Sequence, residues 1–115
     1  MIRKNQMKQI NLQKKIRNKF VKQGVKMIAP ETVFFSNDTK IGKNVIIEPY
    51  VVIGKKVKIM NNVKILSFCH LEGVKISNGS SIGPFARLRP GTTIEKNVKI
   101  GNFVEIKKSK LKNNT

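Results

Sequence analysis

The sequence predicts an all-β fold, a parallel β-helix of hexapeptide repeats preceded by an N-terminal α-helix. A large aliphatic side chain recurs every six residues between positions 29 and 106, with one change of phase. A small or β-branched residue lies four places after most of these positions, and Pro, Asn and Gly concentrate in between. Such a fixed short period is typical of a solenoid. The alternative, a β-sandwich with short strands, would show period-two alternation and irregular spacing.

The N-terminal segment, residues 1–28, is expected to be a helix and linker. It contains nine Lys or Arg and no acidic residue. Leu12, Ile16 and Phe20 fall at i, i+4 and i+8, which places them along one stripe of a helix from about Gln6 to Gln23. We expect this helix to cover the open end of the solenoid, because solenoids need their first coil capped. The alternative is a basic amphipathic helix that binds a membrane or nucleic acid.

The solenoid domain is expected to span residues 29–115 in about five coils. In a first register the aliphatic position is filled by Ala29, Phe35, Ile41, Ile47, Ile53, Ile59, Ile65 and Leu71. After a step of five residues, a second register continues with Ile76, Ile82, Leu88, Ile94, Ile100 and Ile106. We expect these side chains to fill a narrow, triangular interior, and the smaller residues four places later to pack near the next corner.

Turn-forming residues mark the corners of the predicted solenoid. Asn or Gly lies three places after the aliphatic position at Asn44, Asn62, Gly79, Gly91 and Asn97. Both residue types tolerate the left-handed backbone that a tight corner requires. The corners are therefore expected at these positions.

The single cysteine and the single histidine of the chain, Cys69 and His70, are neighbours. Cys69 occupies an interior position, so we expect a small core residue, and His70 should face solvent. A metal site or a nucleophile–base pair would need more partners than these two residues, so no metal ligand is assigned. A lone cysteine excludes an internal disulfide and fits a reducing compartment.

The chain is strongly basic, with 24 Lys or Arg against six acids and a formal net charge of +18. Such a charge favours a polyanionic partner. Lys, Asn and Ile are all abundant, however, which favours a bias in composition, so nucleic acid is the weaker alternative. No apolar run is long enough to span a bilayer, and no secretory signal is evident. The sequence therefore predicts a soluble, cytoplasmic protein without a membrane partner.

Five stretches carry a resemblance to a known family, and three of them are Ala29-Pro30-Glu31-Thr32-Val33-Phe34, Ile47-Glu48-Pro49 and Leu71-Glu72-Gly73. The other two are the longest. They are Ile82-Gly83-Pro84-Phe85-Ala86-Arg87-Leu88-Arg89-Pro90-Gly91 and Gly101-Asn102-Phe103-Val104-Glu105-Ile106-Lys107-Lys108. They resemble left-handed β-helix acyltransferases, in particular the bifunctional N-acetylglucosamine-1-phosphate uridyltransferase/glucosamine-1-phosphate N-acetyltransferase family. The resemblance implies a left-handed parallel β-helix and a homotrimer. It also implies acetyl transfer from acetyl-CoA to glucosamine-1-phosphate, followed by uridylyl transfer that gives UDP-N-acetylglucosamine.

Arg89 and Lys107 are the candidate substrate-binding residues. They lie 18 residues apart, which is one coil of three hexapeptides, and each follows an aliphatic position directly. We expect both cations to project from one face about 4.8 Å apart, where an anion between them would relieve their repulsion. The resemblance implies that they bind the phosphorylated sugar, glucosamine-1-phosphate or UDP-N-acetylglucosamine. Arg87 and Glu105, also 18 residues apart, should form an ion pair.

The resemblance further implies features that this sequence lacks. The general-base histidine of the family would lie beyond Thr115, so no catalytic residue is assigned. The coils that bind acetyl-CoA, and the uridyltransferase domain with its Mg²⁺, are missing too. We expect a fragment, truncated at its C-terminus, that keeps part of the sugar-phosphate site without turnover. The alternatives are a non-enzymatic trimeric assembly module and, less favoured, a basic nucleic-acid-binding protein.

Overall fold

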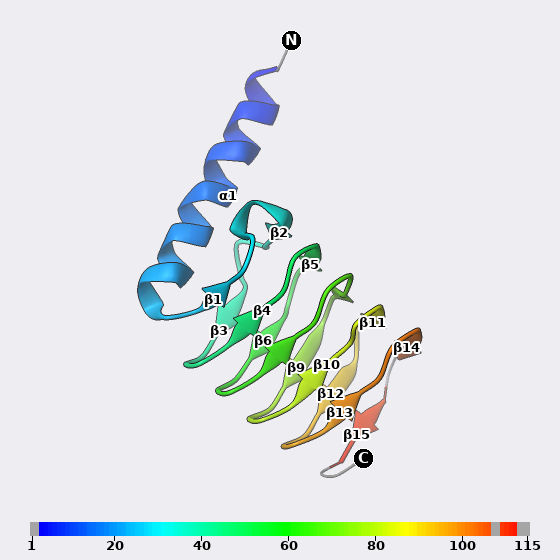
Figure 1. Ribbon diagram of the computed structural model, residues 1–115. Helices are drawn as coiled ribbons and strands as arrows, with labels where there is room; N and C mark the ends of the chain where they lie inside the picture. Colours follow the sequence, from blue (N-terminus) through cyan, green and yellow to red (C-terminus); the bar gives the residue numbers. More distant parts are fainter. Residues whose placement is uncertain (1–2, 107–108, 113–115) are drawn as a thin grey trace.

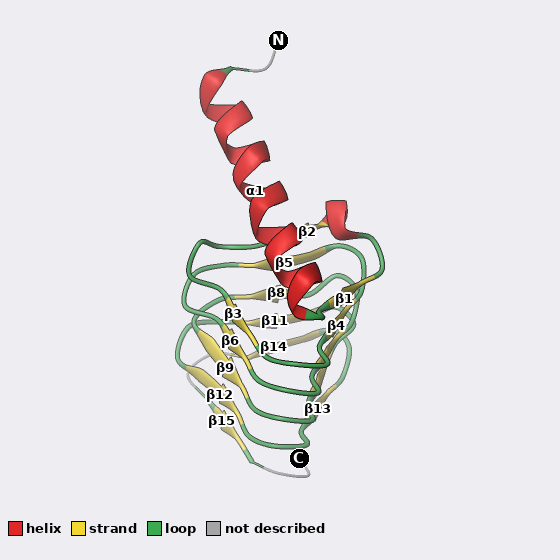
Figure 2. Ribbon diagram, turned by 90° about the vertical axis from the view of Figure 1, so that its left-hand side faces the viewer, coloured by secondary structure: helices red, strands yellow, loops and turns green. Residues whose placement is uncertain are grey.

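The chain folds into one helix followed by a parallel β-solenoid, as the computed structural model shows for residues 3–106 and 109–112 (Figure 1). The solenoid has three sides, each a parallel sheet of five short strands. Figure 2 shows one of these sides with the helix over the first coil. The predicted β-helix of hexapeptide repeats with an N-terminal helix is thus confirmed, while its left hand stays a prediction from the resemblance.

Each coil contributes one strand to each side of the solenoid. The side that we call the arginine face contains β2 (Val33–Phe34), β5 (Val51–Ile53), β8 (His70–Leu71), β11 (Ala86–Leu88) and β14 (Val104–Ile106). The lysine face contains β3 (Lys40–Ile41), β6 (Lys58–Ile59), β9 (Val74–Ile76), β12 (Thr92–Ile94) and β15 (Lys110–Leu111). The mixed face contains β1 (Lys26–Met27), β4 (Ile46–Ile47), β7 (Lys64–Ile65), β10 (Ser81–Ile82) and β13 (Lys99–Ile100).

The parallel register aligns the outward side chains of each face in one column. On the arginine face the column is Phe34, Val52, His70, Arg87 and Glu105. On the lysine face it is Lys40, Lys58, Lys75, Thr93 and Lys110. On the mixed face it is Lys26, Ile46, Lys64, Ser81 and Lys99.

The coil that contains Gly73 is one residue shorter than its neighbours. Most paired residues lie 18 positions apart, but His70 pairs with Arg87, only 17 positions away. This confirms the predicted change of phase. Gly73 has a φ of 56°, and a Cβ there would lie 2.8 Å from the Pro90 Cα atom. Any other residue at this corner would therefore clash with the next coil.

The first coil is longer than the others, because Lys26 pairs with Ile46, 20 positions away. A short 3₁₀ helix, Pro30–Thr32, occupies the extra length. Met27 fills the interior of this coil, whereas Ala29 is only half-buried. The prediction that Ala29 is the first interior residue is wrong, because the inserted 3₁₀ turn breaks the six-residue spacing.

The predicted interior is confirmed for the following coils. Every residue at the predicted aliphatic position from Phe35 to Ile100 is buried, and so are the smaller residues predicted to follow them up to Val98. Val74 joins the core at the change of phase, and Ile106 is half-buried against it. Because the interior is alike from coil to coil, the three faces differ only in what they turn outward.

The corners adopt a left-handed backbone at the third position after the aliphatic residue. Positive φ occurs there at the predicted Asn44, Asn62, Gly79, Gly91 and Asn97. It also occurs at five residues that do not favour this conformation, namely Tyr50, Lys56, Phe68, Phe85 and Phe103. The geometry of the coil therefore overrides the local preference of these residues.

The helix α1 spans Lys4–Gln23 and begins two residues before the predicted start at Gln6. The Arg3 N–H donates a hydrogen bond to Gln6 Oε1 at 2.8 Å, which ties the first turn together and extends the helix. The N-terminal half of α1 projects beyond the solenoid (Figures 1 and 2). No helix among the described residues combines the length and the apolar character that crossing a membrane requires.

The C-terminal half of α1 covers the first coil. Phe20 is buried, and its ring centroid lies 5.0 Å from that of Phe35. Gln13 Nε2 donates to the Phe35 carbonyl oxygen at 2.7 Å, and its Oε1 accepts from the Phe35 N–H at 2.9 Å. The helix thus supplies hydrogen-bond partners that a neighbouring strand would otherwise provide, which confirms the expected covering role.

Candidate functional site

The candidate site lies on β11 and β14 of the arginine face. Alternation along β11 buries Ala86 and Leu88 and turns Arg87 outward, in register with Glu105 on β14. Arg89 follows the end of β11, where the chain starts to turn the corner. Three charged side chains are thereby gathered on two adjacent coils.

Glu105 lies between the two arginines. Its Oε2 atom is 3.8 Å from Arg87 Nη1 and 3.9 Å from Arg89 Nη1. The first contact confirms the ion pair expected from the 18-residue spacing. The contact between Arg89 and Glu105 was not predicted. The 18-residue spacing pairs only residues that stack one above the other, whereas the Arg89 side chain reaches back along its own strand. All three side chains are about half exposed, so each pair contributes about 0–1 kcal/mol to stability.

Backbone hydrogen bonds hold Arg89 in place. Its N–H donates to the carbonyl oxygen of Ile106 at 2.7 Å, and Thr92 Oγ1 donates to the Arg89 carbonyl oxygen at 2.8 Å. Lys107, the second predicted substrate-binding residue, lies outside the described residues. The stacking of Arg89 on Lys107 therefore stays a prediction.

The contact with Glu105 affects how the Arg89 guanidinium can bind an anion. A guanidinium has five N–H donors in a fixed fork, and Glu105 Oε2 lies 3.9 Å from the Arg89 Nη1 atom, which is beyond hydrogen-bond distance. The donors can bind a phosphate or carboxylate through two parallel hydrogen bonds. Glu105 also lowers the repulsion between neighbouring cations, so an anion is not needed to make the site stable.

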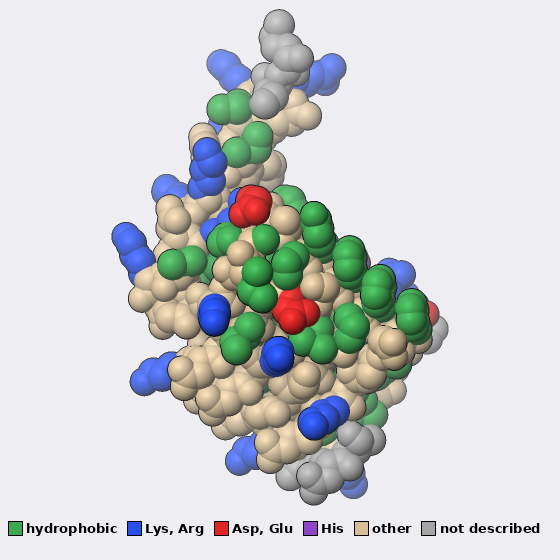
Figure 3. Space-filling view, viewed as in Figure 1, with side chains coloured by type: hydrophobic (Ala, Val, Ile, Leu, Met, Phe, Trp, Pro, Cys, Tyr) green, Lys and Arg blue, Asp and Glu red, His purple; other side chains and the backbone are tan. Residues whose placement is uncertain are grey.

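An aromatic corner borders the site. Tyr50, Phe68, Phe85 and Phe103 stack with ring centroids 4.8 to 5.4 Å apart and their planes within 11° of parallel. All four are exposed, and Figure 3 shows a row of hydrophobic side chains along this edge of the solenoid. We did not predict this stack, although the aromatic residues recur at intervals of 17 and 18.

A shallow hollow of about 400 Å³ joins the aromatic corner to the charged residues. Its lining residues are Phe68, His70, Phe85, Ala86, Arg87, Phe103, Val104 and Glu105. The hollow therefore offers aromatic surface on one side and a guanidinium on the other, which suits a ligand with both an apolar and an anionic part.

Cys69 and His70 lie on opposite sides of the sheet, as expected. Cys69 is buried, and burial raises the pKa of its thiol above the ordinary value. A protonated thiol inside the core is a poor nucleophile. His70 is exposed and lies in register with Arg87. In the described part of the chain, no three His, Cys, Asp or Glu residues gather as metal ligands.

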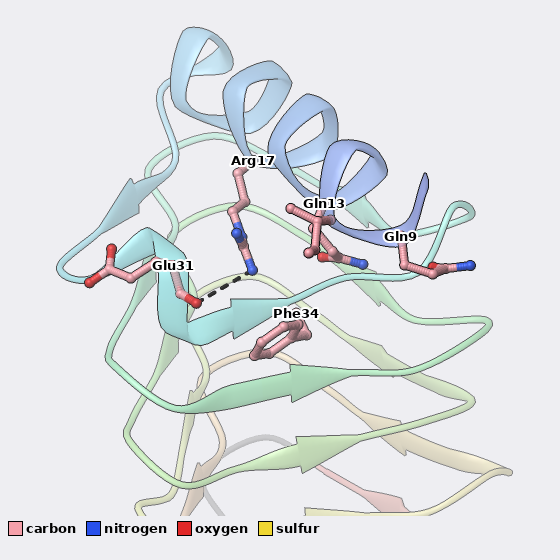
Figure 4. A pocket seen from close by; sticks show the side chains of 6 residues that line it. Gln9, Gln13, Arg17, Glu31 and Phe34 are labelled. Carbon is pink, nitrogen blue, oxygen red and sulfur yellow. Dashed lines mark hydrogen bonds between the residues drawn. The ribbon is translucent and has the colours of Figure 1, made fainter. Parts of the chain in front are cut away.

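A second hollow, of about 320 Å³, lies between α1 and the first coil. Figure 4 shows Gln9, Gln13 and Arg17 on the helix beside Glu31 and Phe34 of the first coil, with Arg17 reaching toward the Glu31 backbone. The Arg17 guanidinium donates to the Glu31 carbonyl oxygen at 3.5 Å and lies 5.1 Å from the centre of the Phe34 ring. Since these contacts dock the helix onto the solenoid, we assign this hollow to the cap.

Comparison with known proteins agrees with the fold. The profile described as "Bacterial transferase hexapeptide (six repeats)" matches residues 38–73 and 73–108. The chain is 57% identical over 99 residues to the bifunctional protein GlmU of Zymomonas mobilis and 50% identical over 96 residues to that of Wolbachia pipientis. These matches cover 86% and 84% of this chain but 22% of each relative. The chain thus matches about a fifth of the length of these relatives.

The comparison with solved structures found the acetyltransferase domain of PglB from Neisseria gonorrhoeae. It is 17% identical in sequence, and the superposition has a TM-score of 0.47. The superposition covers 80% of this chain and 57% of that one.

Proposed function

Because the chain belongs to the bacterial transferase hexapeptide family, we propose that its arginine face forms part of the sugar-phosphate site of an acetyltransferase domain. The support comes from Arg89. Its backbone is fixed by two hydrogen bonds, its guanidinium is oriented by Glu105, and most of its donors stay available. It also lies within the Arg87-Leu88-Arg89-Pro90-Gly91 stretch that carries the family resemblance.

In this proposal each charged residue has a separate role. Arg89 grips the phosphate of glucosamine-1-phosphate or UDP-N-acetylglucosamine through its guanidinium fork. Glu105 positions that guanidinium, and Arg87 adds positive charge beside it. Lys107 would supply a second, point-like cation. The sugar ring would lie over the hollow beside Phe85 and Phe103.

Acetyl-CoA would supply the acetyl group, and further coils would hold it together with the base that deprotonates the amine. Cys69 is buried and protonated, so it is not suited to carry an acyl group. The Mg²⁺ of the family would belong to a uridyltransferase domain. The described residues offer no cluster of ligands that fits a metal, so no step of this proposal uses one.

Calorimetric titration with glucosamine-1-phosphate tests the binding site. Arg89→Ala should weaken binding at least about 10-fold, because it removes charge-assisted hydrogen bonds. Arg89→Lys should recover only part of this loss, since lysine lacks the fork. Lys58→Ala, which removes one cation from the lysine face, is the matched control and should leave affinity unchanged. Equal losses in Arg89→Ala and Lys58→Ala would overturn the assignment.

The second part of the proposal is that this chain alone binds the sugar phosphate without acetylating it. Incubation with glucosamine-1-phosphate and acetyl-CoA should release no free thiol above the rate without protein. His70 is the only imidazole near the site, so His70→Gln is the informative variant. Thiol release that disappears in His70→Gln would contradict the proposal and identify a base within this chain.

We also propose that the chain forms a homotrimer through the arginine face. Phe34 and Val52 are exposed apolar residues in its column, and the aromatic corner adjoins them. The columns of the other two faces contain seven lysines in total, which would repel a second chain of charge +18. Sedimentation should give a mass three times 13.0 kDa, and Val52→Lys should give monomers. A monomeric unmodified chain would contradict the trimer.

A further inference from the structure

The lysine face carries an uninterrupted row of cations. Lys40 pairs in register with Lys58, and Lys58 with Lys75, so three lysines lie on three successive coils. All three are exposed. Neighbouring strands are roughly 4.8 Å apart, and like charges directly opposite each other destabilise a sheet. The row of lysines therefore does not stabilise the fold.

These lysines lack a counter-charge in the described part of the chain. In the ranges 3–106 and 109–112, no carboxylate lies within 4 Å of Lys40, Lys58 or Lys75. Further along the column, Glu95 does pair with Lys110, at 3.5 Å. A ligand with several negative charges would supply the missing charge for the first three.

A general excess of lysine does not explain this arrangement. The arginine-face column contains no lysine, and the mixed-face column separates its three lysines with Ile46 and Ser81. Only the lysine face has them on consecutive coils. The surplus of positive charge is therefore segregated, although the backbone offers the same outward positions on every side.

The surface beside the row has room for an anionic group. A hollow of about 200 Å³ lies against Lys40 and Lys58, with Gly42, Met60 and Asn61 in its lining. A Cβ on residue 42 would lie 2.9 Å from the Met60 carbonyl carbon, so the glycine lets the two coils that line the hollow stack closely. A phosphate in the hollow would have an ammonium group on each neighbouring coil.

We propose that the lysine face binds the phosphate backbone of a nucleic-acid duplex without reading its sequence. The three lysines lie on three neighbouring strands and span about 10 Å along the solenoid axis, the length of about three phosphates in one strand of a duplex. Figure 2 shows this face, with β3, β6, β9, β12 and β15 one below another. The lysines therefore lie in a straight row, which can follow the phosphates along one strand of the duplex.

The outward column also favours a duplex over other polyanions. It contains only lysines and Thr93. Single-stranded nucleic acid is usually held by aromatic side chains that stack on bases, and the column has none. Surface binding to a membrane usually buries apolar side chains, and these are absent from the column as well.

Fluorescence anisotropy with a labelled 20-base-pair DNA duplex tests the proposal, using the whole chain. The triple variant K40Q/K58Q/K75Q should bind at least about 10-fold more weakly at 0.1 M NaCl, and the slope of log K against log salt should fall by about 2.7 for three lost phosphate contacts. The variant K40R/K58R/K75R, which keeps the charges, should bind like the unmodified chain. Circular dichroism verifies the fold of each variant.

The matched control is K26Q/K64Q/K99Q on the mixed face. It removes the same number of lysines from exposed strand positions of the same kind. This control should lose much less affinity. Equal losses in the two triple variants would show that net charge alone drives binding and would overturn the proposal. Failure of the unmodified chain to bind the duplex, or equal binding to vesicles of phosphatidylglycerol, would overturn it as well.

Discussion

The arginine face and the lysine face share one backbone repeat but present opposite chemistry. In the arginine-face column a single cation, Arg87, is paired with Glu105 and lies near exposed aromatic rings. The lysine-face column contains four cations, three of them without a carboxylate neighbour among the described residues. The repeat fixes the interior and leaves the outward positions free, so the function of each face depends on its column.

Truncating a buried side chain should cost the most stability, and it should do so equally under the two faces. Leu88 lies under the arginine face and Ile59 under the lysine face, and both are almost completely buried. Leu88→Ala and Ile59→Ala should each lower the free energy of unfolding by about 2–5 kcal/mol, because each leaves a cavity. Urea denaturation measures this. If the free energy of unfolding fell by less than 1 kcal/mol in only one of these variants, the interior under the arginine face would differ from that under the lysine face.

The next effect concerns the aromatic corner that borders the arginine face. Phe85 has a φ of 56° and stacks on Phe68 and Phe103. Phe85→Ala should lower the free energy of unfolding by about 1–3 kcal/mol, since two aromatic pairs are lost. Phe85→Gly loses the same pairs but relieves about 1–2 kcal/mol of left-handed backbone strain. In urea denaturation the glycine variant should therefore be no less stable than the alanine variant, and the reverse order would contradict the strain.

A smaller effect should have opposite signs on the two faces. Lys58→Gln should raise the free energy of unfolding by about 0.5 kcal/mol at low salt, because it interrupts a row of like charges. Arg87→Gln should lower it by about 0–1 kcal/mol, because it removes an ion pair. Both differences should shrink in 1 M NaCl, which screens exposed charges. Effects of the same sign in urea denaturation at 20 mM NaCl would show that the two faces do not differ in their electrostatics.

The smallest effect concerns the corner between the two faces. Asp38 Oδ2 accepts a hydrogen bond from the Lys56 N–H at 3.0 Å. This bond, followed by one from Ser36, lowers the pKa of the Asp38 carboxyl. A lowered pKa stabilises the fold above the ordinary Asp value of about 3.9, and this contribution is lost as the pH falls through the lower folded value. Asp38→Ala should therefore be slightly less stable than the unmodified chain at pH 6 and equally stable near pH 2, and a difference that does not change with pH would contradict this.

The six-residue period was sufficient to predict the interior from Phe35 to Ile100, because only a residue of the right size and polarity fits each inward position, but it failed at Ala29, where the 3₁₀ turn breaks the spacing. The corners at Asn44, Asn62 and Asn97 were predictable for a similar reason, since few residues favour a positive φ. The same conformation at Phe68 and Phe85 was not, because the geometry of the coil overrides the local preference of these residues.

The charged site was less predictable than the interior. The 18-residue spacing was enough for the pair of Arg87 with Glu105. It did not show that Arg89 reaches the same carboxylate, because exposed long side chains are not confined to their own column. The row of lysines was hidden for another reason: in so basic a chain, only the three-dimensional register separates a clustered charge from a general excess.

The arginine face should bind a small sugar phosphate, whereas the lysine face should not. Titration of the ¹⁵N-labelled chain with glucosamine-1-phosphate, followed by NMR chemical shifts, tests it most directly. The largest shifts should occur at Arg89 and its neighbours Arg87 and Glu105. Shifts centred on Lys40 and Lys58 instead would contradict it, because the sugar phosphate would then bind wherever positive charge is densest.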